Sequence, residues 1–286
     1  MIINVRDYVA AEKEKLKQII KDNNLQPRLM IVQVGDNPAS NSYIKGKMKD
    51  CEEVGIEVAL EKHEEDWFYQ QENMTNLHKK MKTYNGIIIQ LPIVDKSIEY
   101  ALQSCIYPEQ DVDGLIYNIF QPCTPIGIIK LLKHLKVELQ GCVITILGKG
   151  ELVGKPLLKM LINEGATIIS CNSKTKDVNK WMRQSDVIIG ATGVPDLITE
   201  ESIGDNVIII DAGTGIKDGK LHGDCSKELY ENSLATVTPV PGGVGLITRL
   251  TLLQNVVDST LNFNILECDD GIIWGEGEQY EWNEEK

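Results

Sequence analysis

A tyrosine and a lysine stand four residues apart in the segment 35–47, which reads G-D-N-P-A-S-N-S-Y-I-K-G-K. The G-D-N-P tetrapeptide is typical of a turn, and Ser40 or Asn41 could cap a helix that begins there. Residues four apart are neighbours on a helix, so we expect Tyr43 and Lys47 on one face. A lysine so placed could work in a cleft, although an isolated pair of this kind is more often solvated.

Three glycines follow a second apolar stretch, in C-V-I-T-I-L-G-K-G-E-L-V-G-K-P. Gly148, Gly150 and Gly154 lie where a strand is expected to end and a helix to begin. Backbone N–H groups at such a helix start can hold a pyrophosphate. The spacing is G-x-G-x-x-x-G, one residue longer than the usual dinucleotide fingerprint. The context therefore favours dinucleotide binding, with a purely structural turn as the alternative.

The end of the next expected strand bears on which dinucleotide would bind. In an NAD site of this type, an acidic residue about twenty positions further on binds the ribose hydroxyls. Here the strand ends in C-N-S-K, residues 171–174, without a carboxylate that would repel a phosphate. Lys149 and Ser173 could supply charge and a donor to a ribose 2′-phosphate. The sequence thus favours NADP over NAD, unless the lysines of these loops are merely solvated.

Polar residues at other strand ends could complete a cleft. Gln90 closes the apolar run G-I-I-I-Q, and its amide could hydrogen-bond an ammonium or a ligand. Asp111 and Asp113 alternate in D-V-D-G, so one could face a cleft while the other pairs locally. A buried aspartate suits a ligand with adjacent N–H donors.

A loop rich in proline and glycine, P-V-P-G-G-V-G, precedes the last expected helix. Pro241 is stiff, whereas Gly242 and Gly243 allow the backbone to approach a ligand closely. The loop could clamp a ligand, or it could be only a tight connection.

Strands and helices alternate around these residues, which predicts an α/β fold with mainly parallel sheets. A first unit has expected strands at 28–34, 57–61 and 86–90. Its expected helices lie at 7–23, from the Ser40 or Asn41 cap to Gly55, and at 69–82. A proline-marked passage at 108–125 is a plausible domain junction. The segments that follow predict a doubly wound second unit. They are a helix at 124–135, the glycine turn, the strands T-I-I-S-C, D-V-I-I-G and V-I-I-I-D, and a helix at 246–261.

Composition excludes several classes of protein. The 286 residues carry a formal charge of −13, which argues against general affinity for nucleic acid or anionic membranes. No apolar run approaches the roughly 20 residues of a membrane helix, and the N-terminus does not read as a signal peptide, so we expect a cytoplasmic protein. The seven cysteines form no C-x-x-C and the four histidines no metal-ligand spacing, so neither disulfides nor a metal site are expected.

Taken together, the motifs resemble the bifunctional methylenetetrahydrofolate dehydrogenase and methenyltetrahydrofolate cyclohydrolase family. The resemblance is carried by V-G-D-N-P-A-S-N-S-Y-I-K-G-K, C-E-E-V-G-I, I-I-I-Q-L-P, D-V-D-G, P-C-T-P-I-G, V-G-K-P and T-P-V-P-G-G-V-G. These motifs occur in the family's order and at similar intervals over most of the chain.

The resemblance implies two α/β domains with a folate cleft between them, and a homodimer. Residues 1–120 would form the folate-binding catalytic domain and residues 121–245 a Rossmann-like NADP-binding domain. The helix at 246–262 would pack back on the first domain. Residues 264–286 form an acidic tail outside the common pattern.

The implied activity is oxidation of 5,10-methylenetetrahydrofolate by NADP, followed by hydrolysis of the methenyl product to 10-formyltetrahydrofolate. Lys47 matches the catalytic lysine of the family, and Gln90 the glutamine that tunes it. Tyr43 matches the ring stacked on the folate, and Asp113 the carboxylate that grips the pterin. The expected folate loop contains Pro241, Gly242 and Gly243, and the expected cofactor contacts are Gly148, Lys149, Gly150, Gly154, Ser173 and Thr214.

This chain departs from the family mainly on the cofactor side. The family often has G-R-S where Gly148, Lys149 and Gly150 stand, and Thr214 replaces an isoleucine. NADP is favoured and NAD remains possible. A monofunctional dehydrogenase, or a catalytically silent folate or nucleotide binder, would be expected to lack Lys47 or Gln90. A short-chain dehydrogenase also uses Y-x-x-x-K, but after its glycine loop, so the order of the motifs excludes it.

Overall fold

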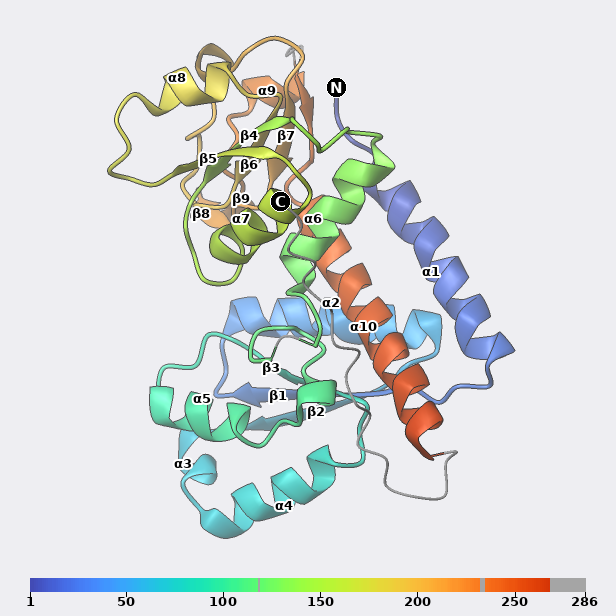
Figure 1. Ribbon diagram of the computed structural model, residues 1–286. Helices are drawn as coiled ribbons and strands as arrows, with labels where there is room; N and C mark the ends of the chain where they lie inside the picture. Colours follow the sequence, from blue (N-terminus) through green and yellow to red (C-terminus); the bar gives the residue numbers. More distant parts are fainter. Residues whose placement is uncertain (118, 232–234, 268–286) are drawn as a thin grey trace, which may run out of the picture.

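The computed structural model describes residues 1–117, 119–231 and 235–267, which form two lobes. Each lobe contains a parallel sheet, and the helices α1, α6 and α10 run along the junction between the lobes (Figure 1). The predicted two-domain α/β fold is confirmed. Most of the predicted acidic tail, from residue 268 onwards, lies outside the described residues.

The first lobe is built on three strands in the order β2-β1-β3, all parallel. The interior of the central strand is buried because its side chains are covered on both faces. The strands are β1 (Arg28–Val34), β2 (Glu57–His63) and β3 (Gly86–Ile89), and the helices are α2 (Pro38–Val54), α3 (Glu65–Phe68), α4 (Gln71–Met81) and α5 (Lys96–Gln103), followed by a short 3-10 turn, η1 (Pro108–Gln110).

The second lobe has a five-stranded parallel sheet in the order β10-β7-β6-β4-β5. The strands are β4 (Val143–Leu147), β5 (Thr167–Cys171), β6 (Val187–Gly190), β7 (Ile208–Asp211) and β10 (Thr236–Val237). They are surrounded by the helices α7 (Gly154–Asn163), α8 (Val178–Arg183) and α9 (Glu228–Glu231), the turn η2 (Glu200–Ser202), and a hairpin of β8 (Gly215–Lys217) and β9 (Lys220–His222). Because the chain turns to opposite sides of β4, the carboxyl end of β4 is the switch point at which such sheets bind ligands.

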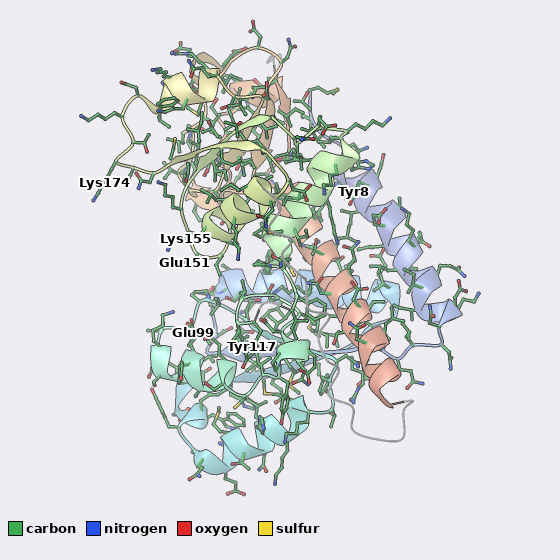
Figure 2. All side chains as sticks on the ribbon, viewed as in Figure 1. Tyr8, Glu99, Tyr117, Glu151, Lys155 and Lys174 are labelled. Atoms are coloured by element: carbon green, nitrogen blue, oxygen red, sulfur yellow. The ribbon has the colours of Figure 1, made fainter. Side chains whose placement is uncertain are left out.

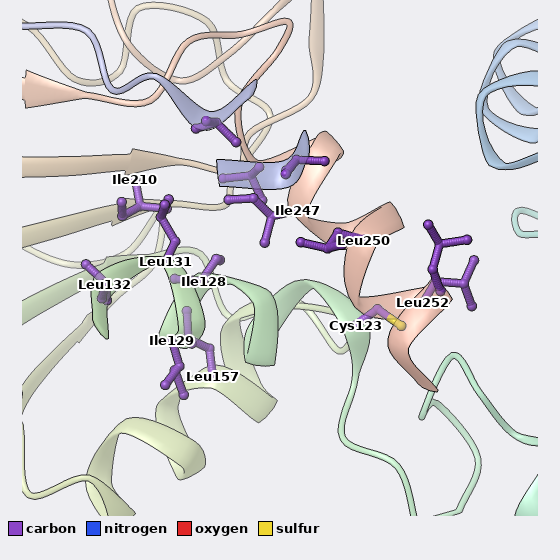
Figure 3. Packing of buried hydrophobic residues seen from close by; sticks show 14 of the residues in the cluster. Cys123, Ile128, Ile129, Leu131, Leu132, Leu157, Ile210, Ile247, Leu250 and Leu252 are labelled. Carbon is purple, nitrogen blue, oxygen red and sulfur yellow. The ribbon is translucent and has the colours of Figure 1, made fainter. Parts of the chain in front are cut away.

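Three helices join the lobes: α1 (Val5–Asp22), α6 (Cys123–His134) and α10 (Val244–Glu267). Figure 3 shows Ile247 and Leu250 of α10 packed near Ile128 of α6, in one apolar cluster that also reaches Ile210 of the second sheet. The chain start also crosses the junction, since Ile2 forms a parallel bridge with Val237 at the edge of β10. The two sheets therefore share one core.

The sequence-based boundaries hold well for the long elements. The strand at 28–34 is confirmed residue for residue, and the helix after the G-D-N-P turn ends at Gly55, as expected. The predicted cap was wrong: Asn37, not Ser40 or Asn41, caps α2 by accepting hydrogen bonds from two backbone N–H groups. The cap lies earlier because proline can occupy the first helical turn, where no intrahelical donor is needed.

Candidate active site

The helix α2 presents one polar face to the junction between the lobes. Lys47 is buried, with 5% of its surface exposed, and its Nζ lies 5.2 Å from the centre of the Tyr43 ring. Nζ donates a hydrogen bond of 3.2 Å to Oε1 of Gln90. The structure therefore brings together the tyrosine, the lysine and the glutamine that the sequence singled out.

Gln90 is itself held in place just beyond β3. Its Nε2 donates to the carbonyl of Leu91 at 2.7 Å, and its backbone N–H donates to Val32 at 2.9 Å. With the amide nitrogen so engaged, the amide oxygen is directed at Lys47. The glutamine thus fixes the position of the ammonium without adding a charge.

The two aspartates of D-V-D-G have different roles in the structure. Asp111 is almost fully buried and accepts hydrogen bonds from the backbone N–H groups of Leu115, Ile116 and Tyr117, so it organises its own loop. Asp113 is half-buried and acts on the Tyr43 hydroxyl through its charge. Asp113 is therefore the aspartate whose charge acts on the Tyr43 side chain.

The electrostatic surroundings of Tyr43 combine burial with charges of both signs. Burial, followed by the charge of Asp113, raises the pKa of the Tyr43 phenol to about 12, and the charge of Arg249 opposes this shift. The phenol is neutral at physiological pH. It can therefore serve as a packing surface and a hydrogen-bond partner, but not as an anionic base.

The glycine turn after β4 forms a closely packed backbone cradle. A Cβ on Gly148 would lie 2.4 Å from the carbonyl oxygen of Ala191, and one on Gly154 would lie 2.2 Å from the carbonyl oxygen of Gly148. Both positions accordingly require glycine, whereas Gly150 has open space around it. The start of α7 has no side-chain cap, but the Lys155 N–H already donates to the Gly150 carbonyl at 3.0 Å and Pro156 has no N–H, so this helix start offers a phosphate fewer backbone donors than usual.

The remaining predicted cofactor residues lie on the rim of the second sheet. Lys149, Ser173 and Thr214 are all exposed. Ser173 lies in the turn after β5, where Asn172 accepts a hydrogen bond from the Lys174 N–H at 3.0 Å. Figure 2 shows Lys174 pointing outward from this loop. The loop offers polar groups to the rim, as expected for a site that accepts a phosphate.

The P-V-P-G-G-V-G loop leads directly into α10. Pro241 is exposed, Gly242 has a φ of +103°, and a Cβ on Gly243 would lie 2.4 Å from the carbonyl oxygen of Pro239. The Leu246 N–H donates to the Gly243 carbonyl at 2.9 Å. The loop is thus a fixed entry into the helix at the junction of the lobes.

Sequence reasoning missed the charged residues that flank Tyr43 and Lys47. Arg249 of α10 pairs with the buried Asp50 of α2, which also pairs with Lys13 of α1. A signal was present, because Tyr43, Lys47 and Asp50 have the spacing i, i+4 and i+7 of one helical face. The partners on α1 and α10 could not be read from that spacing.

The part of the chain that the structure describes contains no group of three or more His, Cys, Asp or Glu side chains that could hold a metal ion. Nor does any helix in the described ranges have the length and apolarity to cross a membrane.

The two lobes, with their parallel sheets, and the residues around Lys47 agree with a two-domain enzyme of folate metabolism, and the chain belongs to the tetrahydrofolate dehydrogenase/cyclohydrolase family. The model of the family's catalytic domain matches residues 3–113, and the model of its NAD(P)-binding domain matches residues 122–264. The resemblance noted from the motifs is confirmed.

Curated relatives support the same family over nearly the whole chain. The bifunctional protein FolD of Exiguobacterium sibiricum is 34% identical over 275 residues, covering 91% of this chain and 99% of the relative. The bifunctional protein FolD of Campylobacter jejuni is 37% identical over 273 residues, covering 87% and 94%.

Solved structures of the same family have a similar fold. The bifunctional enzyme FolD of Campylobacter jejuni has a TM-score of 0.82 at 35% identity, covering 92% of this chain and 99% of that chain. The Trypanosoma brucei enzyme, complexed with NADP and an inhibitor, has a TM-score of 0.84 at 26% identity, covering 92% and 98%.

Proposed function

We propose that this protein oxidises 5,10-methylenetetrahydrofolate to 5,10-methenyltetrahydrofolate with NADP+ and hydrolyses the product to 10-formyltetrahydrofolate. The observation that carries this proposal is the buried Lys47, held by Gln90 and placed against Tyr43 in a chain of this family. Folate one-carbon derivatives are accordingly the substrates, and NADP is the cofactor.

Positioning accounts for most of the oxidation step. When bound, NADP+ accepts the hydride released by the one-carbon bridge of the folate. The cradle at Gly148 and Gly154 fixes the pyrophosphate end of the cofactor. Tyr43 supplies a flat surface for the folate ring system, and Asp113 binds the adjacent N–H donors of the pterin.

For the hydrolytic step, Lys47 is the group that orients water and stabilises the developing negative charge on oxygen. Its ammonium has Gln90 as a neutral partner, so its positive charge is not cancelled by a carboxylate in the same hydrogen bond. Both activities thus use one folate position between the lobes.

We expect Lys47→Met to abolish the cyclohydrolase activity and to leave NADP binding intact, because the cradle lies on the other lobe. The measurement is the decay of methenyltetrahydrofolate absorbance with purified protein. The matched control is Lys45→Met, an exposed lysine on the same helix. Wild-type hydrolysis by the Lys47 variant would refute the assignment.

The same assay separates the alternatives. A monofunctional dehydrogenase would reduce NADP+ without hydrolysing the methenyl product, and a silent binder would do neither. Intact Lys47, Gln90 and Asp113 favour the bifunctional enzyme. Comparing NADP+ with NAD+ tests the cofactor preference, and equal specificity constants would count against Lys149 and Ser173 as phosphate ligands.

The proposal includes the domain boundaries, the oligomeric state and the location of the protein. The folate-binding catalytic domain comprises residues 1–120 with the helix at 246–262, and the NADP-binding domain comprises residues 121–245. We expect a homodimer, as the family resemblance implies, and a cytoplasmic location. Sedimentation equilibrium measures the oligomeric state, and a mass that corresponds to one chain would contradict the dimer.

A further inference from the structure

A buried carboxylate next to the active-site face of α2 is shared by two cations from different helices. Oδ1 of Asp50 lies 2.7 Å from Nζ of Lys13 on α1, and Oδ2 lies 2.5 Å from Nε of Arg249 on α10. Lys13 also reaches Glu53 at 2.8 Å. Lys13 and Asp50 are each only 7% exposed. The three helices at the junction are therefore joined at a single carboxylate.

The guanidinium of Arg249 lies over the backbone of α2 at Gly46. A Cβ on Gly46 would be 2.9 Å from Nη1 and 3.2 Å from Cζ of Arg249. Gly46 follows Tyr43 by three residues and precedes Asp50 by four, so all three share one face of the helix. Arg249 thus extends along the face that carries Tyr43 and Lys47, and its charge acts on the Tyr43 hydroxyl.

This arrangement is not needed to hold α10 in place. Large apolar side chains already bury α10 in the shared core, among them Ile247, Leu250 and Leu253. Buried ion pairs are often neutral for stability, because desolvation offsets the attraction between the charges. The ion pair between Arg249 and Asp50 instead fixes the position of α10 relative to α2. This matters because α10 begins at the P-V-P-G-G-V-G loop and α2 carries the catalytic lysine.

We propose that Arg249 is a positioning residue for the folate reactions. Held by Asp50, it keeps Tyr43 and the 239–245 loop at the separation that the folate requires. The proposal rests on the proposed function and adds a residue to it. Lys13 completes the charge balance of Asp50 from the side of α1.

The test is Gly46→Ala, which adds a methyl group under the guanidinium and removes no charge. Alanine is favoured over glycine within a helix by about 1 kcal/mol, so the helix itself is not weakened. Because the clash is with the flexible end of a side chain, we expect Arg249 to move and the fold to remain.

The expected result for Gly46→Ala is a KM for the folate substrate raised about tenfold in both activities, comparable to losing one hydrogen bond to a charged group. The variant should bind NADP no more weakly than the wild type, and its unfolding midpoint should be no lower. A wild-type KM would overturn the proposal.

Arg249→Met and Lys13→Met form a matched pair, because each removes one cation from the same carboxylate. We expect Arg249→Met to raise the folate KM and Arg249→Lys to restore it in part, whereas Lys13→Met keeps the wild-type KM. Equal effects of both methionine variants on KM would point to general loosening and overturn the proposal.

Calorimetric binding of 10-formyltetrahydrofolate gives a readout that does not depend on turnover. Weaker binding to Gly46→Ala than to wild type supports the role of Arg249, and equal binding overturns it. Wild-type protein that turns over neither folate substrate would refute the proposed function instead, so the two failures are distinguishable.

Discussion

At the scale of single residues, the hydrogen bond from Lys47 to Gln90 sets where the ammonium can act. Gln90→Leu removes the acceptor at 3.2 Å and keeps the approximate volume of the side chain. We expect the cyclohydrolase kcat to fall about 10- to 100-fold, the range for losing a hydrogen bond to a charged group. Stopped-flow absorbance with the exposed Gln71→Leu as control is the measurement. An unchanged kcat would remove Gln90 from the mechanism.

The rim residue Ser173 offers a test of cofactor choice. Ser173→Asp places a carboxylate where the 2′-phosphate of NADP is proposed to bind, so the KM for NADP+ should rise at least about tenfold through like-charge repulsion. The KM for NAD+ should change little. Asn76→Asp, an exposed position on α4 of the first lobe, adds the same charge away from the rim as the control. A parallel rise for both nucleotides would contradict the placement.

Most of the candidate site was accessible from the sequence because its residues belong to short local motifs. Tyr43 and Lys47 share a helical face, and Gln90 ends a strand, so their convergence follows from period and topology. Arg249 and Asp50 are 199 residues apart, and only the packing of α10 on α2 brings them together. An ion pair between distant elements has no signature in local spacing.

At the scale of elements, α5 shows how one cap makes a helix end depend on pH. Asp95 accepts hydrogen bonds from the Ser97 N–H at 2.7 Å and from the Tyr69 hydroxyl at 2.5 Å. The Tyr69 hydroxyl, followed by Ser97, lowers the pKa of Asp95 from 3.8 to about 2. A carboxyl with a lowered pKa stabilises the fold above its ordinary pKa, and that contribution is lost as the pH falls towards the lowered value.

Asp95→Asn keeps a capping oxygen but cannot titrate. The stability advantage of the wild type over this variant should therefore be full at about pH 5 and vanish between about pH 4 and about pH 2. Urea unfolding followed by circular dichroism across this range measures it. A difference that stays constant over the whole range would show that the carboxylate does not contribute through ionisation.

The elements that the sequence did not predict are short or depend on distant partners. The two residues of β10 gain their strand character from β7 on one side and the chain start on the other. The helix α5 has eight residues, and the hairpin of β8 and β9 has three residues a strand. Such segments contain too few turns or alternations for periodicity to show.

At the scale of the whole molecule, α10 attaches the first lobe to the shared core through polar contacts. The Ser259 hydroxyl lies 2.8 Å from the Asn85 carbonyl and 2.9 Å from the Glu109 carbonyl, so its single proton is shared between them, and the Asn255 amide donates to Val112 at 2.8 Å. These bonds join α10 to the end of the first lobe remote from the cradle. The alternation of elements predicted the parallel two-lobed architecture, and the family resemblance implied that the last helix returns to the first lobe. The individual hydrogen bonds of that helix could not be predicted.

Ser259→Ala removes a donor that two partly buried carbonyls share, so we expect a loss of about 1 kcal/mol in the free energy of unfolding. Because the lobes share a core, unfolding should remain a single transition. Chemical denaturation is the measurement, with Thr260→Val as control, since Thr260 donates only within its own helix. A second transition in the wild type would contradict the shared core.

The position of α10 at the end of the described chain has a consequence for synthesis. The first sheet is complete once β3 has been made and Val112 follows it closely, but Val256 of α10, which also packs against Gly86 of β3, emerges more than a hundred residues later. Until then one face of that sheet lacks its helix, while the second lobe is already being assembled. The catalytic face of α2 therefore acquires its final geometry only as α10 leaves the ribosome, so the oldest part of the nascent chain is the last to become active.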